Sequence, residues 1–127
     1  MASAVLDSSA ILAVLNKEVG ADTVVAVLDD ALVSTVNYSE VVAKLMERGS
    51  TSAQAQSALR SIALTTVDFD IALAQRTGAL RAETIRRGLS LGDRACLSLA
   101  EREGVPAVTG DRNWVGAVSG VEIRLIR

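Results

Sequence analysis

Four acidic residues stand at positions from which their side chains could act together on one substrate: Asp7, Glu40, Asp93 and Asp111. Asp7 directly follows an apolar run, residues 2–6, that is typical of a short strand buried on both faces. Asp111 lies just past a second such run, residues 106–109. In α/β proteins the carboxyl ends of the strands and the N-termini of the helices meet along one edge of the sheet, where ligands bind. The spacing therefore predicts that these acids converge at that edge.

Asp93 is predicted to lie in the first turn of a helix. Ser90 is a good N-cap residue, and an acid three residues later completes the pattern of a capped first turn. Apolar residues, together with the lone Cys96, recur through the segment that follows, so we expect a largely buried helix. Gly104 is expected to end it. The helix start is thus expected at the same edge of the sheet as Asp7.

Clustered carboxylates repel one another and raise each other's pKa unless a cation lies between them. The sequence has no His and a single Cys, which excludes His general bases, His–Cys zinc sites, Ser-His-Asp or Cys-His nucleophiles, and disulfides. A hard divalent cation such as Mg²⁺ or Mn²⁺ takes oxygen ligands and lowers the pKa of a bound water. The acids therefore indicate metal-dependent hydrolysis, with helix caps and surface charges as the alternative interpretation.

The composition limits the class of protein. The chain has 127 residues, which is enough for a single domain, residues 1–127, with one sound core. Its net charge of −2 argues against a protein that coats nucleic acid by bulk attraction. No apolar stretch approaches the length of a membrane span, and Asp7 interrupts the first apolar run. We therefore expect a cytoplasmic protein without a signal peptide or a membrane contact.

Short apolar runs alternate with helical patterns along the chain. Extended segments are predicted at residues 2–6, 31–36, 64–67, 106–109 and 121–126. Helices are predicted at residues 10–15, 19–30, 37–48, 51–63, about 70–87 and 90–104. Such alternation predicts an α/β fold with a parallel central sheet of four to five strands and helices on both faces. The last extended segment is expected at an edge of the sheet.

Glu40 falls within the predicted helix at residues 37–48. Apolar residues form one face of this helix, and Glu40 lies across from that face together with Asn37, Lys44 and Glu47. Periodicity alone therefore predicts that Glu40 is an ordinary exposed residue.

Arginines are concentrated in one part of the chain. Residues 76–94 contain five of them and only two acids, Glu83 and Asp93. Arg pairs with phosphate through two parallel hydrogen bonds, so this segment is the candidate surface for a polyanion, and a solvated helix face is the alternative. The candidate phosphate-binding residues are Arg81, Arg86, Arg87, Arg94 and Arg112.

Four sequence blocks, in this order and spacing, resemble the PIN-domain ribonucleases: AVLDSSAIL, SEVVAKL, SLGDRACLSLA and TGDRNW. The chain is most similar to the VapC-type toxins of bacterial type II toxin–antitoxin systems, and the resemblance covers essentially all of it. The resemblance implies a PIN-like three-layer α/β/α fold and an endoribonuclease that depends on Mg²⁺ or Mn²⁺. It also implies that Asp7, Glu40, Asp93 and Asp111 are the catalytic and metal-binding residues, with Glu40 turned toward the crevice.

The resemblance implies partners and supporting residues as well. Ser8, Thr109 and Asn113 would supply polar groups beside the acids, and the arginines named above would bind the RNA substrate. A cognate antitoxin would hold the activity off by inserting a segment near the site. A homodimer is expected, and residues 19–28 are one candidate surface for it, although they could equally be core. The RNA target, the number of metal ions and the choice between Mg²⁺ and Mn²⁺ stay open.

Two other classes of protein share some of these features. A receiver-like domain has a similar length and an acidic metal pocket, but it resembles a different pattern, with paired acids after the first strand and a Lys after the last. Here Ser8 follows Asp7, and the lysines are Lys17 and Lys44. A non-catalytic α/β binding module, in which the acids are only caps and surface charges, would have no affinity for metal ions. Metal binding therefore separates the two interpretations that remain.

Overall fold

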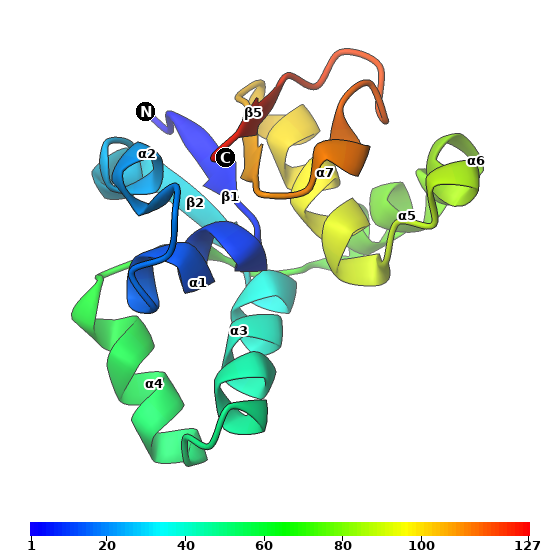
Figure 1. Ribbon diagram of the computed structural model, residues 1–127. Helices are drawn as coiled ribbons and strands as arrows, with labels where there is room; N and C mark the ends of the chain where they lie inside the picture. The colour runs from blue at the N-terminus through cyan, green and yellow to red at the C-terminus, as the bar shows by residue number, and fades with distance from the viewer.

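The computed structural model describes residues 1–127 and contains a five-stranded sheet in which all neighbouring strands are parallel (Figure 1). The strands are β1 (Ala4–Leu6), β2 (Ala31–Ser34), β3 (Thr65–Val67), β4 (Ala107–Thr109) and β5 (Ile123–Leu125). Their order across the sheet is β3-β2-β1-β4-β5, which places β1 at the centre and β5 at an edge. The predicted α/β class and the predicted edge strand are therefore confirmed.

Seven helices and three 3₁₀ turns connect the strands. The helices are α1 (Ser8–Leu15), α2 (Ala21–Val25), α3 (Thr35–Glu47), α4 (Ser52–Ser61), α5 (Ile71–Ala79), α6 (Arg81–Thr84) and α7 (Leu91–Glu103). The 3₁₀ turns are η1 (Leu28–Asp30), η2 (Ile85–Arg87) and η3 (Arg112–Trp114). None of the helices is long and apolar enough to cross a bilayer.

The strands supply side chains to two cores, one on each face of the sheet. Ala4 and Leu6 of β1 pack in the core that α1, α2, α3 and α4 cover. Val5, between them, packs in the core that α5 and α7 cover on the other face (Figure 1). Successive residues of a strand point to opposite faces, so a short strand that is apolar throughout is buried on both sides. The molecule therefore has three layers, α/β/α.

Two long helices predicted from the sequence are interrupted. Residues 19–30 form α2 and then η1, because valines follow one another there and β-branched residues lose side-chain freedom in a helix. Residues 70–87 divide into α5, α6 and η2. The Thr84 hydroxyl donates a hydrogen bond of 2.8 Å to the Leu80 carbonyl, and such side-chain bonds compete with the helical backbone pattern.

The second strand is shorter than predicted, and the helix after it begins earlier. β2 ends at Ser34, whose hydroxyl accepts a hydrogen bond from the Val36 N–H and caps α3. Residues 35 and 36 were expected in the strand, but they form the first turn of this helix. The N-terminus of α3 therefore lies directly at the carboxyl end of β2.

The carboxyl edge of the sheet is where β1 and β4 end side by side. Leu6 pairs with Val108 in the parallel register, and the Asp7 N–H donates to the Val108 carbonyl at 3.1 Å. Helices α1 and α3 start at this edge, immediately after β1 and β2. Helix α7 starts with the predicted Ser90 cap and ends with Gly104 in the left-handed conformation, as predicted. Strand ends and helix starts thus bring the candidate acids to one region.

Candidate active site

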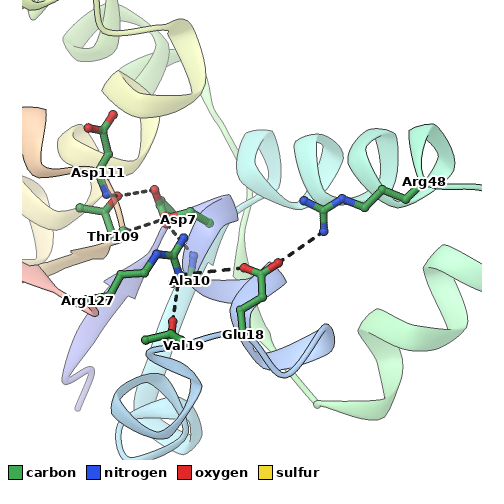
Figure 2. Close-up of polar contacts among 10 residues, drawn as sticks. Asp7, Ala10, Glu18, Val19, Arg48, Thr109, Asp111 and Arg127 are labelled. Carbon is green, nitrogen blue, oxygen red and sulfur yellow. Dashed lines mark hydrogen bonds and ion pairs between the residues drawn. The ribbon is translucent and has the colours of Figure 1, made fainter.

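Asp7 lies at the carboxyl end of β1 and caps the first turn of α1. Its Oδ1 accepts hydrogen bonds from the Ala10 N–H at 2.9 Å and from the Ser9 hydroxyl at 2.7 Å. Its Oδ2 accepts a hydrogen bond of 2.6 Å from the Thr109 hydroxyl at the end of β4 (Figure 2). The residue is only 5 % exposed. Two neighbouring strand ends therefore hold one buried carboxylate between them.

The environment of Asp7 raises its pKa from 3.8 to about 6. Burial is the largest cause, because removal from water penalises the charged form. The hydrogen bonds from Thr109, Ser9 and Ala10 act against this rise, and the negative charge of Asp93 adds to it. A carboxyl group with this pKa exchanges its proton close to neutral pH, which is a mark of functional sites.

Asp93 occupies the first turn of α7 and forms a capping box with Ser90. Its Oδ2 accepts a hydrogen bond of 2.9 Å from the Ser90 N–H, while the Ser90 hydroxyl accepts one of 3.1 Å from the Asp93 N–H. Asp93 is also close enough to Asp7 to raise its pKa. The structure therefore places Asp7 and Asp93 at the same edge, as the sequence predicted.

Glu40 lies in α3 and reaches the first turn of α7. Its Oε1 accepts a hydrogen bond of 2.9 Å from the Asn37 side-chain amide, which also donates to the Gly92 carbonyl at 3.0 Å. The Glu40 carboxylate lies so close to Gly92 that a Cβ at that glycine would overlap it. Glu40 is therefore half-buried between two helices and faces the carboxyl edge, contrary to the prediction from periodicity and in agreement with the family resemblance.

A surface cavity of about 580 Å³ opens beside Glu40. Its walls come from α3 and from the start of α7, with Thr35, Ser39, Glu40, Ser90 and Leu91 among the lining residues. Glu40 is the only charged residue of the lining. A ligand can therefore approach this carboxylate from solvent.

Asp111 reaches the same edge through its backbone, while its carboxylate turns away. The Asp111 N–H donates to the Thr109 hydroxyl at 3.0 Å. Its Oδ1 accepts a hydrogen bond of 2.9 Å from the Asn113 N–H and caps η3. In Figure 2 the Asp111 carboxylate points away from Asp7. In this orientation the Asp111 carboxylate therefore does not join the other acids.

Three of the four acids surround one part of α7. Burial raises the pKa of the Cys96 thiol well above its usual value, and the charges of Asp7, Asp93 and Glu40 raise it further. Cys96 is fully buried in the core, as the sequence predicted. The three carboxylates therefore lie within electrostatic range of one buried residue of α7.

The carboxylates do not form a ready ligand set for a metal ion. No group of three or more Asp, Glu, Cys or His side chains lies in an arrangement that could hold one. The carboxylates of Asp93 and Asp111 are engaged instead as caps of their own helical turns. The donor chemistry does fit a hard cation, because all four candidates offer oxygen and none is paired with an Arg or Lys side chain.

The amino-acid sequence matches a protein-family model. The PIN domain family model matches residues 4–117, a span that runs from β1 past η3 and contains all four acids. The chain belongs to the PIN domain family. A search among curated protein sequences finds no match.

The PIN domain fold is shared with solved toxin–antitoxin complexes. The chain resembles a chain of the DNA-bound VapBC structure from Salmonella typhimurium, with a TM-score of 0.78 and 20% identity over 100% of both chains. It resembles a chain of VapBC2 from Rickettsia felis, bound to a promoter DNA fragment, with a TM-score of 0.73 and 19% identity over 95% of this chain and 96% of that one. For VapBC-5 from Mycobacterium tuberculosis the TM-score is 0.67 and the identity 22%, over 100% and 99%. At these identities the likeness is one of fold.

The serine that hydrogen-bonds Asp7 in this PIN domain is Ser9, which the sequence analysis did not single out; the role predicted for Ser8 stays a prediction. The Ser9 hydroxyl donates to Asp7 and accepts a hydrogen bond of 2.9 Å from the Gly110 N–H. It thereby ties the loop after β4 to the first turn of α1. Position 9 rather than position 8 faces that loop because of the rotation per residue in the first helical turn.

Thr109 and Asn113 take different places in the site. Thr109 lies beside Asp7, as predicted, and bonds both Asp7 and Asp111. Asn113 lies one step further out, where its side-chain amide donates to the Arg87 carbonyl at 2.6 Å. Asn113 therefore holds the segment after β4 against η2 and bonds an acid only through its backbone N–H.

The candidate arginines of the PIN domain fall into three groups. Arg94 is buried, and its Nη1 donates to the Thr77 carbonyl at 2.9 Å, so its predicted place on a phosphate-binding surface was wrong. Its position in α7 turns it toward α5, which periodicity alone does not reveal. Arg87 is exposed, but its Nη1 bonds the carbonyls of residues 113 and 115. Arg81, Arg86 and Arg112 are exposed and form no ion pair, so they stay candidates.

Sequence reasoning missed two residues that shape the site. Asn37 was placed on the exposed side of its helix, yet it is 1 % exposed and bonds Glu40. Gly92 was not singled out, yet its missing side chain makes room for the Glu40 carboxylate. The spacing of three residues between Asn37 and Glu40 puts both on one helical face, and this is the signal that could have found the contact.

Proposed function

We propose that this PIN domain is a metal-dependent endoribonuclease that hydrolyses RNA phosphodiester bonds and acts as the toxin of a toxin–antitoxin pair. The observation that carries the proposal is the buried Asp7 carboxylate, which has no cationic partner and lies beside Asp93. A buried carboxylate without a cationic partner is costly, and a bound cation would remove that cost. Membership of the PIN domain family supports a nuclease activity.

Asp7, Glu40, Asp93 and Asp111 are the residues that would hold Mg²⁺ or Mn²⁺. Such an ion, when bound, lowers the pKa of a water and stabilises the charge that develops on a phosphate during hydrolysis. Asp7 and Glu40 are already fixed by hydrogen bonds. Asp93 and Asp111 would have to exchange their capping bonds for the ion.

Neighbouring groups prepare the acids for this task. The Thr109 hydroxyl donates to Asp7 and lowers its pKa, which favours the ionised form that binds a cation. On the surface, Arg81, Arg86 and Arg112 would bind RNA phosphates. The chain thus supplies anionic groups for the ion and cationic groups for the substrate.

The proposed partner is a small antitoxin protein. Several solved structures that share the fold are VapBC complexes, which supports a partner of this kind. An Arg of the antitoxin, inserted toward unpaired carboxylates, would neutralise them and compete with the metal ion. The carboxyl edge, with its open cavity beside Glu40, suits such an insertion.

The decisive experiment is cleavage of end-labelled total RNA by the purified protein with Mg²⁺, with Mn²⁺ or with a chelator. The matched control is Asp7→Asn, which keeps the size of the side chain and removes its charge. Discrete fragments that require the ion and disappear in the variant are expected. If folded protein neither cleaves RNA nor binds Mn²⁺, the proposal is wrong and the acids serve as helix caps and surface charges in a non-catalytic binding module.

A further inference from the structure

A buried amide, Asn37, joins α3 to the first turn of α7. Its Nδ2 donates to Glu40 Oε1 at 2.9 Å and to the Gly92 carbonyl oxygen at 3.0 Å. Carboxylate and carbonyl oxygens only accept hydrogen bonds, so these two partners establish which end of the amide carries the hydrogens. One hydrogen of Nδ2 is thus directed at Glu40, and the other at the carbonyl of Gly92, the residue before Asp93.

The oxygen of the same amide has no partner. Asn37 Oδ1 is buried and accepts no hydrogen bond. A buried acceptor without a donor costs about 1–3 kcal/mol, a cost that a small apolar side chain at this position would not carry. The two bonds from Nδ2 are therefore the reason for an amide at this position, and one of them holds Glu40.

Asn37 and Gly92 enclose the Glu40 carboxylate from two sides. Gly92 leaves room for it, since a Cβ there would overlap the carboxylate. Asn37 then holds it in that space, against the residue before Asp93. An amide is neutral, so it orients the carboxylate without pairing with its charge as Arg or Lys would. Glu40 therefore has a fixed orientation and no cationic side chain as its partner.

We propose that Asn37 is a positioning residue that holds the Glu40 carboxylate in place at the carboxyl edge, where Glu40 contributes to binding a divalent cation. The inference rests on the metal-dependent activity proposed above. Groups that hydrogen-bond a metal-binding side chain fix its orientation, and their loss lowers metal affinity or activity by about 10–100-fold. A purely structural Asn37 would change stability alone.

The test measures the Kd for Mn²⁺ by calorimetry, and the unfolding of the metal-free protein, for two variants. Asn37→Ala removes both donated bonds. Asn37→Asp keeps the size of the side chain and places a carboxylate oxygen against the Glu40 carboxylate, so that the two groups repel each other. Both variants are expected to raise the Kd for Mn²⁺ by about 10–100-fold. An unchanged Kd in either folded variant overturns the proposal.

The matched control is another buried hydrogen bond onto the same helix. Thr77 Oγ1 and Ser98 Oγ lie 2.7 Å apart between α5 and α7, further along α7 than the acids. Thr77→Val removes this bond and should lower the melting temperature while leaving the Kd for Mn²⁺ unchanged. If Thr77→Val weakens Mn²⁺ binding as much as Asn37→Ala does, the effect of Asn37 is a general loosening of α7, and the proposal is overturned.

A double-variant cycle with Glu40→Gln shows whether Asn37 acts through Glu40. Adding Asn37→Ala to Glu40→Gln should weaken Mn²⁺ binding no further. If the effects of the two single variants on the Kd instead add up in the double variant, Asn37 does not act through Glu40. Wild-type protein that binds Mn²⁺ and cleaves RNA, with Asn37 variants of unchanged affinity, overturns this inference alone. Wild-type protein that does neither overturns the proposed function, and this inference with it.

Discussion

Asp7 combines two roles that conflict in their energetics. As the cap of α1 it accepts a hydrogen bond from Ala10, and this bond stabilises the helix start. As a buried carboxylate it resists ionisation, so its pKa rises to about 6. A residue that served only as a cap would gain nothing from this burial. The conflict itself therefore points to a function that needs a desolvated carboxylate, and it leads to two predictions at the scale of single residues.

The first prediction concerns stability and pH. Between the usual pKa of 3.8 and the folded pKa of about 6, the folded state binds more protons at Asp7 than the unfolded state does. Asp7 therefore favours folding at acidic pH, and this contribution is lost as the pH rises through about 6, by about 3 kcal/mol in all. Asp7→Asn should remove this pH dependence and make the metal-free protein more stable near neutral pH. Urea unfolding from about pH 4 to about pH 8, with chelator present, measures it.

The same Asp7→Asn variant should lose RNA cleavage while it gains stability. Functional sites often keep residues that lower stability, and their replacement separates the two properties. An Asp7→Asn protein that is less stable than wild type near neutral pH would contradict the assigned burial cost. Ser9→Ala is the control for the loss of a hydrogen bond alone, because it removes one hydrogen bond to Asp7 and leaves the charge of Asp7 in place.

The second prediction concerns the Thr109 hydroxyl, which lowers the pKa of Asp7. Thr109→Val should raise that pKa, because a charge-assisted hydrogen bond to the carboxylate is removed. With Mn²⁺ below saturation, the acidic limb of the cleavage rate against pH should move to higher pH by about one unit. Thr109→Ser keeps the hydroxyl and should leave the limb in place. Identical profiles of cleavage rate against pH for Thr109→Val and Thr109→Ser would show that Thr109 contributes packing and does not change the pKa of Asp7.

At the scale of elements, the site depends on how α3 meets the first turn of α7. The strand ends place Asp7 and Thr109 through hydrogen-bonded register, but Glu40 comes from the side of a helix. Its position therefore depends on the packing of α3 on α7. Gly92 permits the close approach, because the Glu40 carboxylate takes the space that a side chain at that position would fill. This arrangement gives a third prediction.

Gly92→Ala should displace the Glu40 carboxylate with little effect on stability. Ala is favoured over Gly in a helix by about 1 kcal/mol, which offsets the loss of the Asn37 bond. The free energy of unfolding should stay within about 1 kcal/mol of wild type, while the Kd for Mn²⁺ rises by about tenfold. Gly78→Ala in α5, where a Cβ meets nothing within 4 Å, is the matched control and should leave Mn²⁺ binding unchanged. Equal Mn²⁺ affinities in the two variants would exclude the proposed role of this glycine.

At the scale of the whole molecule, a net charge of −2 means that the proposed RNA substrate would be bound through local cationic groups. Arg76 is engaged with Glu101, and Arg94 is buried, so the basic segment presents fewer free cations than its composition indicates. Arg81 and Arg86 belong to α6 and η2, which project from the body of the molecule in Figure 1. They are the exposed cations of this segment that form no bond within the chain.

The fourth prediction is that the double substitution Arg81→Gln and Arg86→Gln weakens RNA binding and its dependence on salt. For each RNA phosphate that an arginine no longer neutralises, the slope of log affinity against log salt concentration should fall by about 0.7 for single-stranded RNA. Fluorescence anisotropy with labelled RNA, in the Asp7→Asn background to prevent cleavage, measures both quantities. Arg60→Gln on the distant α4 is the control and should change neither. A double variant with an unchanged slope would exclude α6 from the RNA surface.

The fifth prediction concerns self-association. Val24 is buried in the core, whereas Val19 is 76% and Val25 is 55% exposed, so the candidate surface at residues 19–28 is part core and part apolar surface. We expect a homodimer that uses the exposed valines. Sedimentation of the wild type should give a dimer, and Val25→Glu should shift it toward monomer. A dimer that Val25→Glu leaves intact would place the interface elsewhere.

Local signals in the sequence were sufficient to predict the parallel sheet, the capped start of α7 and the placement of Asp7 and Asp93 at one edge of the sheet. An apolar run followed by Asp7 and the Ser90–Asp93 capping box are short-range patterns, because a strand end or a helix cap involves neighbours only a few residues apart. The absence of His is a property of composition and restricts the chemistry whatever the fold. These features needed no tertiary structure.

Only the tertiary structure decided the details that depend on what packs opposite each residue. It buried Asn37 and Arg94, which periodicity alone would leave at the surface, and it turned the Asp111 carboxylate toward η3. It selected Ser9 as the hydrogen-bond partner of Asp7. Helical periodicity tells which residues share a face, but the environment of that face is set by elements distant in sequence, as the bond from Asn37 to Gly92 illustrates.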